Sequence, residues 1–345
     1  MARTPPPRLR EISQTPVNIA AADWLPYTLP LKRPWLTSKG KITERQGRLL
    51  RLRTSDGRYG WGDSAPLPEF GISESAANAF AEESAHLDLV ARQASQPLCQ
   101  WLSGDAPVAD LVVNGNLGTL SDSTPAMLAP AAAQGFSVVK LKVGINPVRE
   151  EIARLHQLAS SSAPEVSWRL DANCAWSLAD AQAFISGCAD LPIEGLEEPL
   201  ANPDRTALGR LQSLAPWPIA LDESTQLVDD AFFRHPFVRR LVIKPARHGL
   251  LGSVELALRA RAAGIETVVT SGLESACGLA ACAQLAAAIA PESVHGLMTA
   301  DWLAADTGMS NPILKARMQL PASNGIGFTP HDTFAVTPPG NQERR

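Results

Sequence analysis

The chain has 345 residues, which exceeds one average domain, so one large α/β barrel or two domains are the leading expectations. Its 45% apolar and 19% charged residues exclude a disordered or fibrous protein, and a net charge of −4 argues against a nucleic acid as the main partner. The sequence has no apolar run of about 18 residues, so we expect no membrane span and no membrane partner. Five cysteines without a CxxC pair predict reduced thiols and a cytoplasmic location.

The first third of the chain is predicted to be a small α+β unit that follows a tail. Residues 1–16, rich in proline and arginine, are the expected tail. Residues 49–54 alternate between apolar and polar, residues 55–57 predict a turn, and the strand pattern resumes at residue 59, which together indicate an antiparallel hairpin or meander. Residues 73–103 then show a helical pattern that begins at a serine cap.

A different rhythm starts near residue 111, where short β-branched runs alternate with helical stretches. Many runs end in a polar residue, and these ends follow one another at intervals of 22 to 29 residues, enough for one strand, one helix and two loops. Eight parallel strands at this spacing predict a (β/α)8-type barrel, with an open doubly wound sheet as the alternative. The barrel is favoured because its strand ends meet around one mouth. The strand candidates are 111–114, 138–143, 166–171, 193–197, 219–222, 241–244, 267–271 and 294–297.

Three carboxylates, those of Asp171, Glu197 and Asp222, end three successive candidate strands. One such acid alone is more often a helix cap or a surface group, but three in a row would repel one another unless a cation lay between them. Hard oxygen ligands favour Mg²⁺, with Mn²⁺ as the second choice. The sequence therefore predicts a divalent metal site at the barrel mouth.

Lysines end the candidate strands on either side of the acids. Lys140 and Lys142 share one strand face because side chains alternate along a strand, and Lys244 ends the strand after the acids. The simpler interpretation places these lysines in solvent, but the apolar residues between and around them argue against it. A lysine beside a divalent cation can act as a base near neutral pH. The pattern predicts removal of a proton α to a carboxylate, with the metal and a second cation stabilising the enediolate.

Several short motifs follow one another in a fixed order along the chain. They are residues 140–142 (KLK), 171–176 (DANCAW), 197–199 (EEP), 221–224 (LDES), 243–245 (IKP) and, earlier, 60–68 (GWGDSAPLP). Over about residues 17–330 this set resembles the enolase superfamily, and within it the muconate-lactonizing subgroup. The resemblance implies a modified (β/α)7β barrel at 111–310 and an α+β capping domain at 17–110, which part of 310–335 completes. Residues 336–345 are expected to form a second tail.

The resemblance also implies roles for individual residues. Lys142 is expected to be the general base and then the acid for a departing hydroxyl, Lys244 the opposing cation, and Lys140 a residue that tunes Lys142 or steers a carboxylate. The implied ligands of Mg²⁺ are Asp171, Glu197 and Asp222. The implied substrate-binding residues, with Arg45 closing over the substrate from the capping domain, are Ser271, Gly272, Arg45 and Asn173.

Three further segments narrow the implied reaction. Residues 44–47 (ERQG), 270–275 (TSGLES) and 297–303 (LMTADWL) resemble subgroup members that dehydrate 2-succinyl-6-hydroxy-2,4-cyclohexadiene-1-carboxylate to 2-succinylbenzoate. The implied protein is a hydro-lyase of menaquinone or phylloquinone biosynthesis that acts on a small carboxylate. Racemisation of N-succinylamino acids and epimerisation of dipeptides are the nearest alternatives, although residues 299–301 (TAD) lack the D-x-D motif expected of an epimerase. A Schiff-base aldolase and a barrel that only binds its ligand are more distant alternatives.

The aromatic residues are unbalanced, with eight tryptophans against two tyrosines. Trp61, Trp176 and Trp302 adjoin the motifs above, so we expect them near the barrel mouth, where a flat apolar surface suits a cyclohexadiene ring. The other five tryptophans are expected to pack in the core or between the domains, with a mobile early loop as the alternative place for Trp35.

Overall fold

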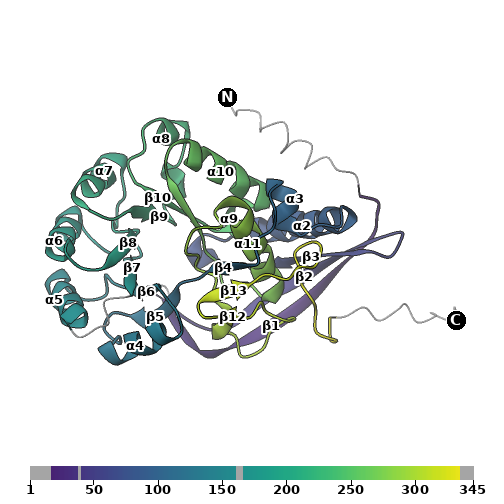
Figure 1. The fold of residues 1–345 in the computed structure, drawn as a ribbon, viewed down its shortest axis with the longest axis horizontal. Helices are drawn as coiled ribbons and strands as arrows, with labels where there is room; N and C mark the ends of the chain where they lie inside the picture. The colour runs from purple at the N-terminus through teal and green to yellow at the C-terminus, as the bar shows by residue number, and fades with distance from the viewer. Residues whose placement is uncertain (1–16, 38–39, 161–165, 335–345) are drawn as a thin grey trace.

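The computed structural model describes residues 17–37, 40–160 and 166–334, so both predicted tails lie outside the described residues. Figure 1 shows an antiparallel sheet with its helices beside a ring of strands that helices surround. Within the described ranges, no helix is long and apolar enough to cross a bilayer.

The N-terminal unit is built on a three-stranded antiparallel sheet in the order β1-β2-β3, which contains the predicted hairpin. Helix α2 begins after Ser73, whose hydroxyl accepts a hydrogen bond from the Ala76 amide, as the cap predicted. The helix lies directly on β3, because a Cβ at Gly62 would lie 1.9 Å from the Ala81 carbonyl oxygen. The elements are β1 (Ile19–Thr37), β2 (Gly40–Thr54), β3 (Tyr59–Ser64), the 3-10 turn η1 (Pro68–Phe70), α2 (Glu74–Gln93) and α3 (Leu98–Ser103).

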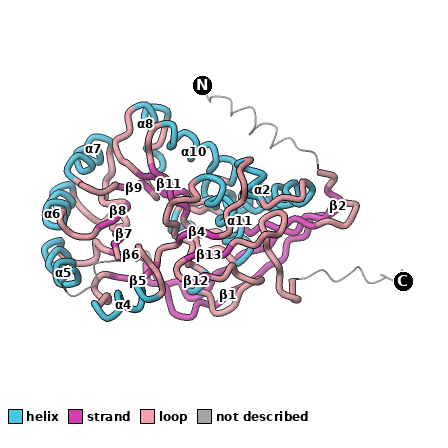
Figure 2. Tube along the Cα trace, viewed as in Figure 1, coloured by secondary structure: helices cyan, strands magenta, loops and turns pink. Residues whose placement is uncertain are grey.

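A seven-stranded parallel sheet in strictly sequential order, β5 to β11, forms the second unit. Figure 2 shows its strands on the inside and its helices on the outside, the arrangement of a barrel rather than of an open doubly wound sheet. The strands are β5 (Gly115–Thr119), β6 (Val138–Lys142), β7 (Ser167–Asp171), β8 (Ile193–Glu197), β9 (Ile219–Leu221), β10 (Arg240–Ile243) and β11 (Glu266–Val269). The helices are α4 (Pro125–Ala133), α5 (Val148–Ser160), α6 (Leu178–Cys188), α7 (Arg205–Leu214), α8 (Asp230–Arg234), α9 (Pro245–His248), α10 (Leu250–Ala262) and α11 (Ala276–Ile289).

The ring closes through single backbone bridges instead of a full eighth strand. His295 bridges Val113 and Gly296 bridges Thr270, both in the parallel sense, so the predicted strand 294–297 is reduced to two bridges. The predicted first strand, 111–114, is also divided: β4 (Asp110–Val112) pairs with β13 (Arg317–Gln319), which pairs with β12 (Ile313–Leu314). The predicted fold class, an α/β barrel of modified form with an N-terminal α+β unit, is confirmed.

Charged side chains lie together in the barrel, below the level of the predicted site residues. The Glu194 carboxylate on β8 accepts hydrogen bonds from Arg169 Nε at 2.9 Å and from Arg240 Nη1 at 2.9 Å. Arg169 also donates to the carbonyl oxygen of Val294 at 2.9 Å. Arg169 stands two residues before Asp171 on β7, so this network supports the strand that ends in the first predicted metal ligand.

Candidate active site

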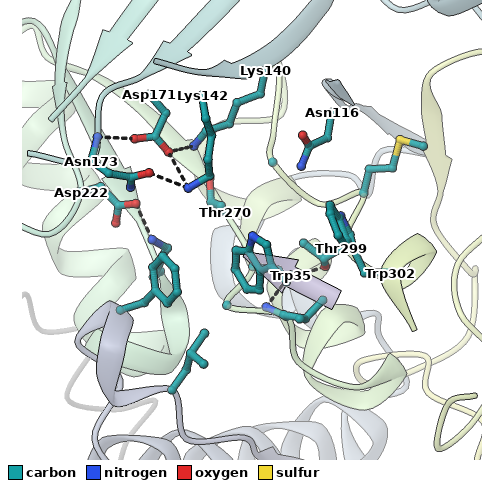
Figure 3. Close-up of a pocket in the computed structure, with 18 of the residues that line it drawn as sticks. Trp35, Asn116, Lys140, Lys142, Asp171, Asn173, Asp222, Thr270, Thr299 and Trp302 are labelled. Carbon is teal, nitrogen blue, oxygen red and sulfur yellow. Dashed lines mark hydrogen bonds and ion pairs between the residues drawn. The ribbon is translucent and has the colours of Figure 1, made fainter. Parts of the chain in front are cut away.

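A pocket at the carboxyl ends of the barrel strands gathers most of the predicted site residues (Figure 3). Of the ten predicted residues, eight line it: Lys140, Lys142, Asp171, Asn173, Asp222, Lys244, Ser271 and Gly272. Glu197 lies beside the pocket and contacts Lys140, whereas Arg45 is placed elsewhere. Parallel strands explain this convergence, because side chains about 25 residues apart in sequence end at one mouth.

The carboxylates and the lysines are paired with one another. Lys140 Nζ lies 2.9 Å from Asp171 Oδ2 and also donates to Glu197 Oε2. Lys244 donates to Asp222 Oδ2. Charge neutralisation of this kind is required, because an uncompensated buried carboxylate is strongly unfavourable.

The ionisation of these groups follows from burial opposed by charge pairing. Burial alone would raise the pKa of Asp171, but the charges of Lys140 and Lys142 outweigh it and lower the pKa to about 2. Burial would also raise the pKa of Asp222, but the charge of Lys244 outweighs burial and lowers it. For Glu197 burial is the larger effect, and the pKa is raised. Burial would lower the pKa of Lys140, yet the surrounding carboxylates raise it above its ordinary value.

The chemistry of the three carboxylates fits a divalent cation. Asp171, Glu197 and Asp222 are 4%, 1% and 3% exposed and offer hard oxygen ligands, two of them in the pocket and that of Glu197 beside it. Lys140 bridges two of them and Lys244 pairs with the third. Accordingly, no three acidic, histidine or cysteine side chains of the described residues form a preassembled metal cluster. The lysines supply the positive charge that the carboxylates need, and a bound cation would supply it as well.

Glu198 is bound away from the pocket and acts on the loop that carries Asp222. Its carboxylate accepts hydrogen bonds from the Asp222 amide at 2.6 Å and from the Ser224 amide at 2.8 Å. Its backbone φ is 44°, and Asn173 and Cys174 have φ values of 45° and 60°. Non-glycine residues with positive φ cluster at functional sites, where the fold holds the strained conformation.

Two residues of the site were missed by the sequence analysis. Arg247 Nη1 donates to Asp222 Oδ1 at 3.1 Å, and its Nη2 donates to the Phe70 carbonyl oxygen at 2.7 Å, so it ties the N-terminal unit to the barrel. Glu223 lines the pocket with one buried carboxylate oxygen that has no hydrogen-bond partner among the described residues. Burial, and then the charge of Asp222, raise the pKa of Glu223 to about 8. The sequence signal that could have identified Glu223 was its position directly after the predicted metal ligand Asp222.

The structure places Arg45 and Asn173, which were both expected to bind substrate, differently: Arg45 lies outside the pocket and Asn173 lines it. The buried Arg45 guanidinium donates to the carbonyl oxygens of Leu273 at 3.1 Å, Pro66 at 2.9 Å and Ala65 at 2.8 Å, and it does not line the pocket. It holds the loop after β11 against the N-terminal unit. Asn173 does line the pocket, and its Oδ1 accepts a hydrogen bond from Lys142 Nζ at 2.5 Å.

Aromatic residues from both units cover the pocket. Trp35 stacks on Phe70 with ring centres 5.0 Å apart, and Trp302 lies 6.1 Å from Trp35. The Nζ atoms of Lys142 and Lys244 lie 5.9 and 5.7 Å from the centre of the Phe70 ring.

Of the three tryptophans expected at the mouth, only Trp302 lines the pocket, and Trp35, which was not among the three, lines it as well. The prediction was wrong for the other two, because each is buried in apolar packing of its own. Trp61 packs against Phe328, and Trp176 packs against Phe184.

Comparison with known proteins identifies the class. The family described as Enolase C-terminal domain-like matches residues 126–334. The muconate lactonizing enzyme of Pseudomonas fluorescens, solved with muconolactone, shares the fold with a TM-score of 0.81 at 22% identity, covering 92% of this chain and 98% of that one. A dipeptide epimerase from Enterococcus faecalis, solved with Mg and a dipeptide, has a TM-score of 0.79 at 23% identity, covering 91% and 100%. The chain belongs to the enolase superfamily.

Sequence relatives give a finer placement. The o-succinylbenzoate synthase of Edwardsiella ictaluri is 33% identical over 293 residues, covering 79% of this chain and 88% of the relative. That of Klebsiella pneumoniae is 30% identical over 302 residues, with the same two coverages. The predicted resemblance is thereby confirmed at this level, and the chain is an enzyme of the lyase class to which these relatives belong.

Proposed function

We propose that the protein is a Mg²⁺-dependent o-succinylbenzoate synthase. It dehydrates 2-succinyl-6-hydroxy-2,4-cyclohexadiene-1-carboxylate to 2-succinylbenzoate, the reaction of menaquinone or phylloquinone biosynthesis. The observation that carries the proposal is the placement of Lys142 and Lys244 around one pocket, beside three buried carboxylates. The identity to named synthases over most of the chain supports the choice of reaction.

Lys142 performs the proton transfers in this mechanism. Its amine removes the proton from C1, the carbon that bears the carboxylate, and the C1 electron pair is delocalised into that carboxylate as an enediolate. The resulting ammonium of Lys142 then gives its proton to the hydroxyl at C6, the C6–O bond breaks, and water leaves as the ring becomes aromatic. The hydrogen bond from Lys142 to Asn173 Oδ1 fixes the amine for both steps.

Other residues bind and orient the substrate around this lysine. Lys244 lies across the site as the cation that faces the enediolate, and Lys140 holds the carboxylates of Asp171 and Glu197 in position. Asp171, Glu197 and Asp222 are the residues that would hold Mg²⁺. When bound, Mg²⁺ supplies positive charge beside the developing negative charge of the substrate carboxylate.

The N-terminal unit closes the site in this proposal. We assign the capping domain to residues 17–110, completed by part of 310–335, and the catalytic barrel to residues 111–310. The aromatic side chains of Trp35 and Phe70 cover the pocket from the capping side and exclude water from the proton transfer.

The decisive experiment replaces Lys142 by Ala and follows the aromatic absorbance of the product with and without Mg²⁺. Loss of the general base is expected to lower kcat by about 10²–10⁴-fold or more, with an unchanged circular-dichroism spectrum. Lys32→Ala, at an exposed position of β1, is the matched control and is expected to keep full turnover. Wild-type turnover in the Lys142→Ala protein would overturn the proposal.

A second candidate function uses the same two lysines. If Lys142 and Lys244 serve as acid and base on opposite faces of one carbon, the protein racemises N-succinylamino acids or epimerises dipeptides. The fold shared with a dipeptide epimerase supports this candidate, whereas residues 299–301 (TAD) argue against dipeptides. Incorporation of solvent deuterium into N-succinylamino acids, lost in both Lys142→Ala and Lys244→Ala, is the result expected of a racemase.

A further inference from the structure

Two hydroxyl groups meet at the end of the pocket away from the lysines. Ser271 follows β11, Thr299 precedes the 3-10 turn η3 (Ala300–Trp302), and both side chains line the pocket. Their oxygen atoms lie 2.6 Å apart. Figure 3 shows Thr299 beside Trp302 on one side of the pocket and Asp171 with Lys142 on the other. The bridge between Thr270 and Gly296 brings these two strand ends together.

The hydrogen bonds of the pair leave one hydroxyl proton without an acceptor. The amide of Leu273 donates to Ser271 Oγ at 3.1 Å, and the two hydroxyls share one further hydrogen bond. Each hydroxyl carries one proton, so in either direction of that bond the second proton has no acceptor among the described residues. Ser271 is buried, with 5% exposure, while Thr299 is half-buried. Thr299 is therefore the hydroxyl better placed to present this proton to the pocket, at the end of a chain that runs from Leu273 through Ser271.

The neighbouring backbone amide cannot serve the same purpose. Gly272 N–H donates to Glu274 Oε1 at 2.9 Å, and Glu274 is only 1% exposed. The amide is thus engaged inside the loop, although Gly272 lines the pocket. A ligand group that reaches this end meets hydroxyl donors instead.

We propose that Thr299 binds the second carboxylate of the substrate, the one that ends the succinyl arm, with Ser271 as its supporting residue. The inference rests on the proposed function, which supplies a substrate with two carboxylates at opposite ends. The first carboxylate is required beside Lys142, so the arm extends toward the far side of the pocket. Met298 and Trp302 make that side apolar, which strengthens a hydrogen bond to an anion. The Arg33 guanidinium, 4.4 Å from the centre of the Trp302 ring, adds positive charge nearby.

The test compares two ligands that differ only in this carboxylate. The dissociation constants of 2-succinylbenzoate and 2-butanoylbenzoate are measured with Mg²⁺, by calorimetry or by tryptophan fluorescence, in wild type, Thr299→Val, Thr299→Ser and Ser271→Ala. Loss of a hydrogen bond to a charged group is expected to weaken binding of the succinyl compound about ten-fold or more in Thr299→Val, with unchanged binding of the butanoyl compound. Thr299→Ser keeps the hydroxyl and is expected to bind as wild type does, and Ser271→Ala is expected to lose a smaller factor.

Two results would overturn the assignment. The first is Thr299→Val binding 2-succinylbenzoate as tightly as wild type, and the second is an equal loss for both ligands, which indicates a structural role. Turnover is measured on the same preparations to separate the two proposals. Wild-type turnover with either of these binding results refutes the role of Thr299 alone. A wild-type protein without turnover and without preference for the dicarboxylate refutes the proposed function together with it.

Discussion

Replacement of Glu194 by Gln probes the charged network beneath the active site. The Glu194 carboxylate contacts two arginines, with distances of 2.9 Å to Arg169 Nε and 2.6 Å to Arg240 Nη2. The side chains of these arginines are 1% and 6% exposed, and that of Glu194 is 21% exposed. Glutamine keeps the shape of the side chain but removes the negative charge, so the Arg169 guanidinium loses its ionic partner and that of Arg240 keeps only Glu266.

The pKa of Glu194 sets the size of the effect. Burial alone would raise this pKa, but the hydrogen bonds and charges of Arg169 and Arg240 lower it from 4.5 to about 2. A difference of about 2.5 pH units corresponds to about 3 kcal/mol of folding free energy, at 1.36 kcal/mol per unit. Because the pKa is lower in the folded protein, this stability is fully present above about pH 4.5 and is lost as the pH falls toward 2.

The assay is urea unfolding of wild type and Glu194→Gln at pH 7 and pH 3. We expect the variant to be less stable by about 3 kcal/mol at pH 7 and by about half of that at pH 3, where the carboxylate is almost fully protonated in the unfolded chain but still mostly ionised in the folded protein. Glu82→Gln, on the exposed face of α2, is the matched control and is expected to change the stability by less than about 0.5 kcal/mol at both pH values.

Equal stability of Glu194→Gln and wild type at pH 7 would refute the reasoning, because it would mean that the buried arginines do not need the negative charge of Glu194. A difference that stays constant or grows from pH 7 to pH 3 would refute it as well, since the effect would then not come from ionisation of Glu194.

Three further predictions follow from burial and close packing. Gly62→Ala places a Cβ 1.9 Å from the Ala81 carbonyl oxygen and is expected to lower the free energy of unfolding by about 3 kcal/mol in the same urea assay. Its control is Gly209→Ala in α7, where the nearest atom to the new Cβ lies 3.5 Å away, and this variant is expected to be as stable as wild type or more stable. Burial raises the pKa of Asp63 from 3.8 to about 6, so the stability linked to its proton is fully present below pH 3.8 and lost as the pH rises through 6. Wild type is expected to lose about 2.5 kcal/mol relative to Asp63→Asn between pH 4 and pH 7, as measured by urea unfolding. Burial also raises the pKa of all five cysteine thiols, so titration with a thiol reagent at pH 8 is expected to be slow in the native protein and to reach five groups in denaturant; rapid reaction of the native protein would contradict it.

The groups that meet at the mouth were predictable because parallel strands impose a simple rule. Asp171, Asp222 and Lys244 each stand at or directly after the end of an apolar run, and a closed barrel brings such ends together whatever the intervening sequence. Local patterns also sufficed for the hairpin of residues 49–62 and for the start of α2 at Ser73. In each case the information lies within a few residues of the feature.

Contacts between the two units were not predictable in this way. Arg247 reaches Phe70, and Arg45 reaches Leu273, over 177 and 228 residues of sequence. Arg247 stands in no motif of the sequence analysis, and although Arg45 lies in the motif of residues 44–47, only the docking of the N-terminal sheet on the barrel decides which carbonyl oxygen each arginine meets. The prediction of an eighth strand was wrong for a related reason. Residues 294–297 pair with their two neighbours only through single backbone bridges, and these pairings depend on residues far away in the sequence.

The loop after β11 shows how one backbone angle changes the chemistry expected of a motif. The resemblance implied that Ser271 and Gly272 bind the substrate, and either a hydroxyl or a backbone amide could donate the hydrogen bond. Leu273 has a φ of 61°, and its left-handed turn returns the Glu274 carboxylate to that amide. The loop thereby satisfies its own backbone donor, and anion recognition at this end of the pocket passes to the hydroxyl of Thr299, a residue 28 positions away from Ser271. A sequence motif shows which residues are present, but it does not show which of their hydrogen-bond donors are already bound to acceptors within the folded protein.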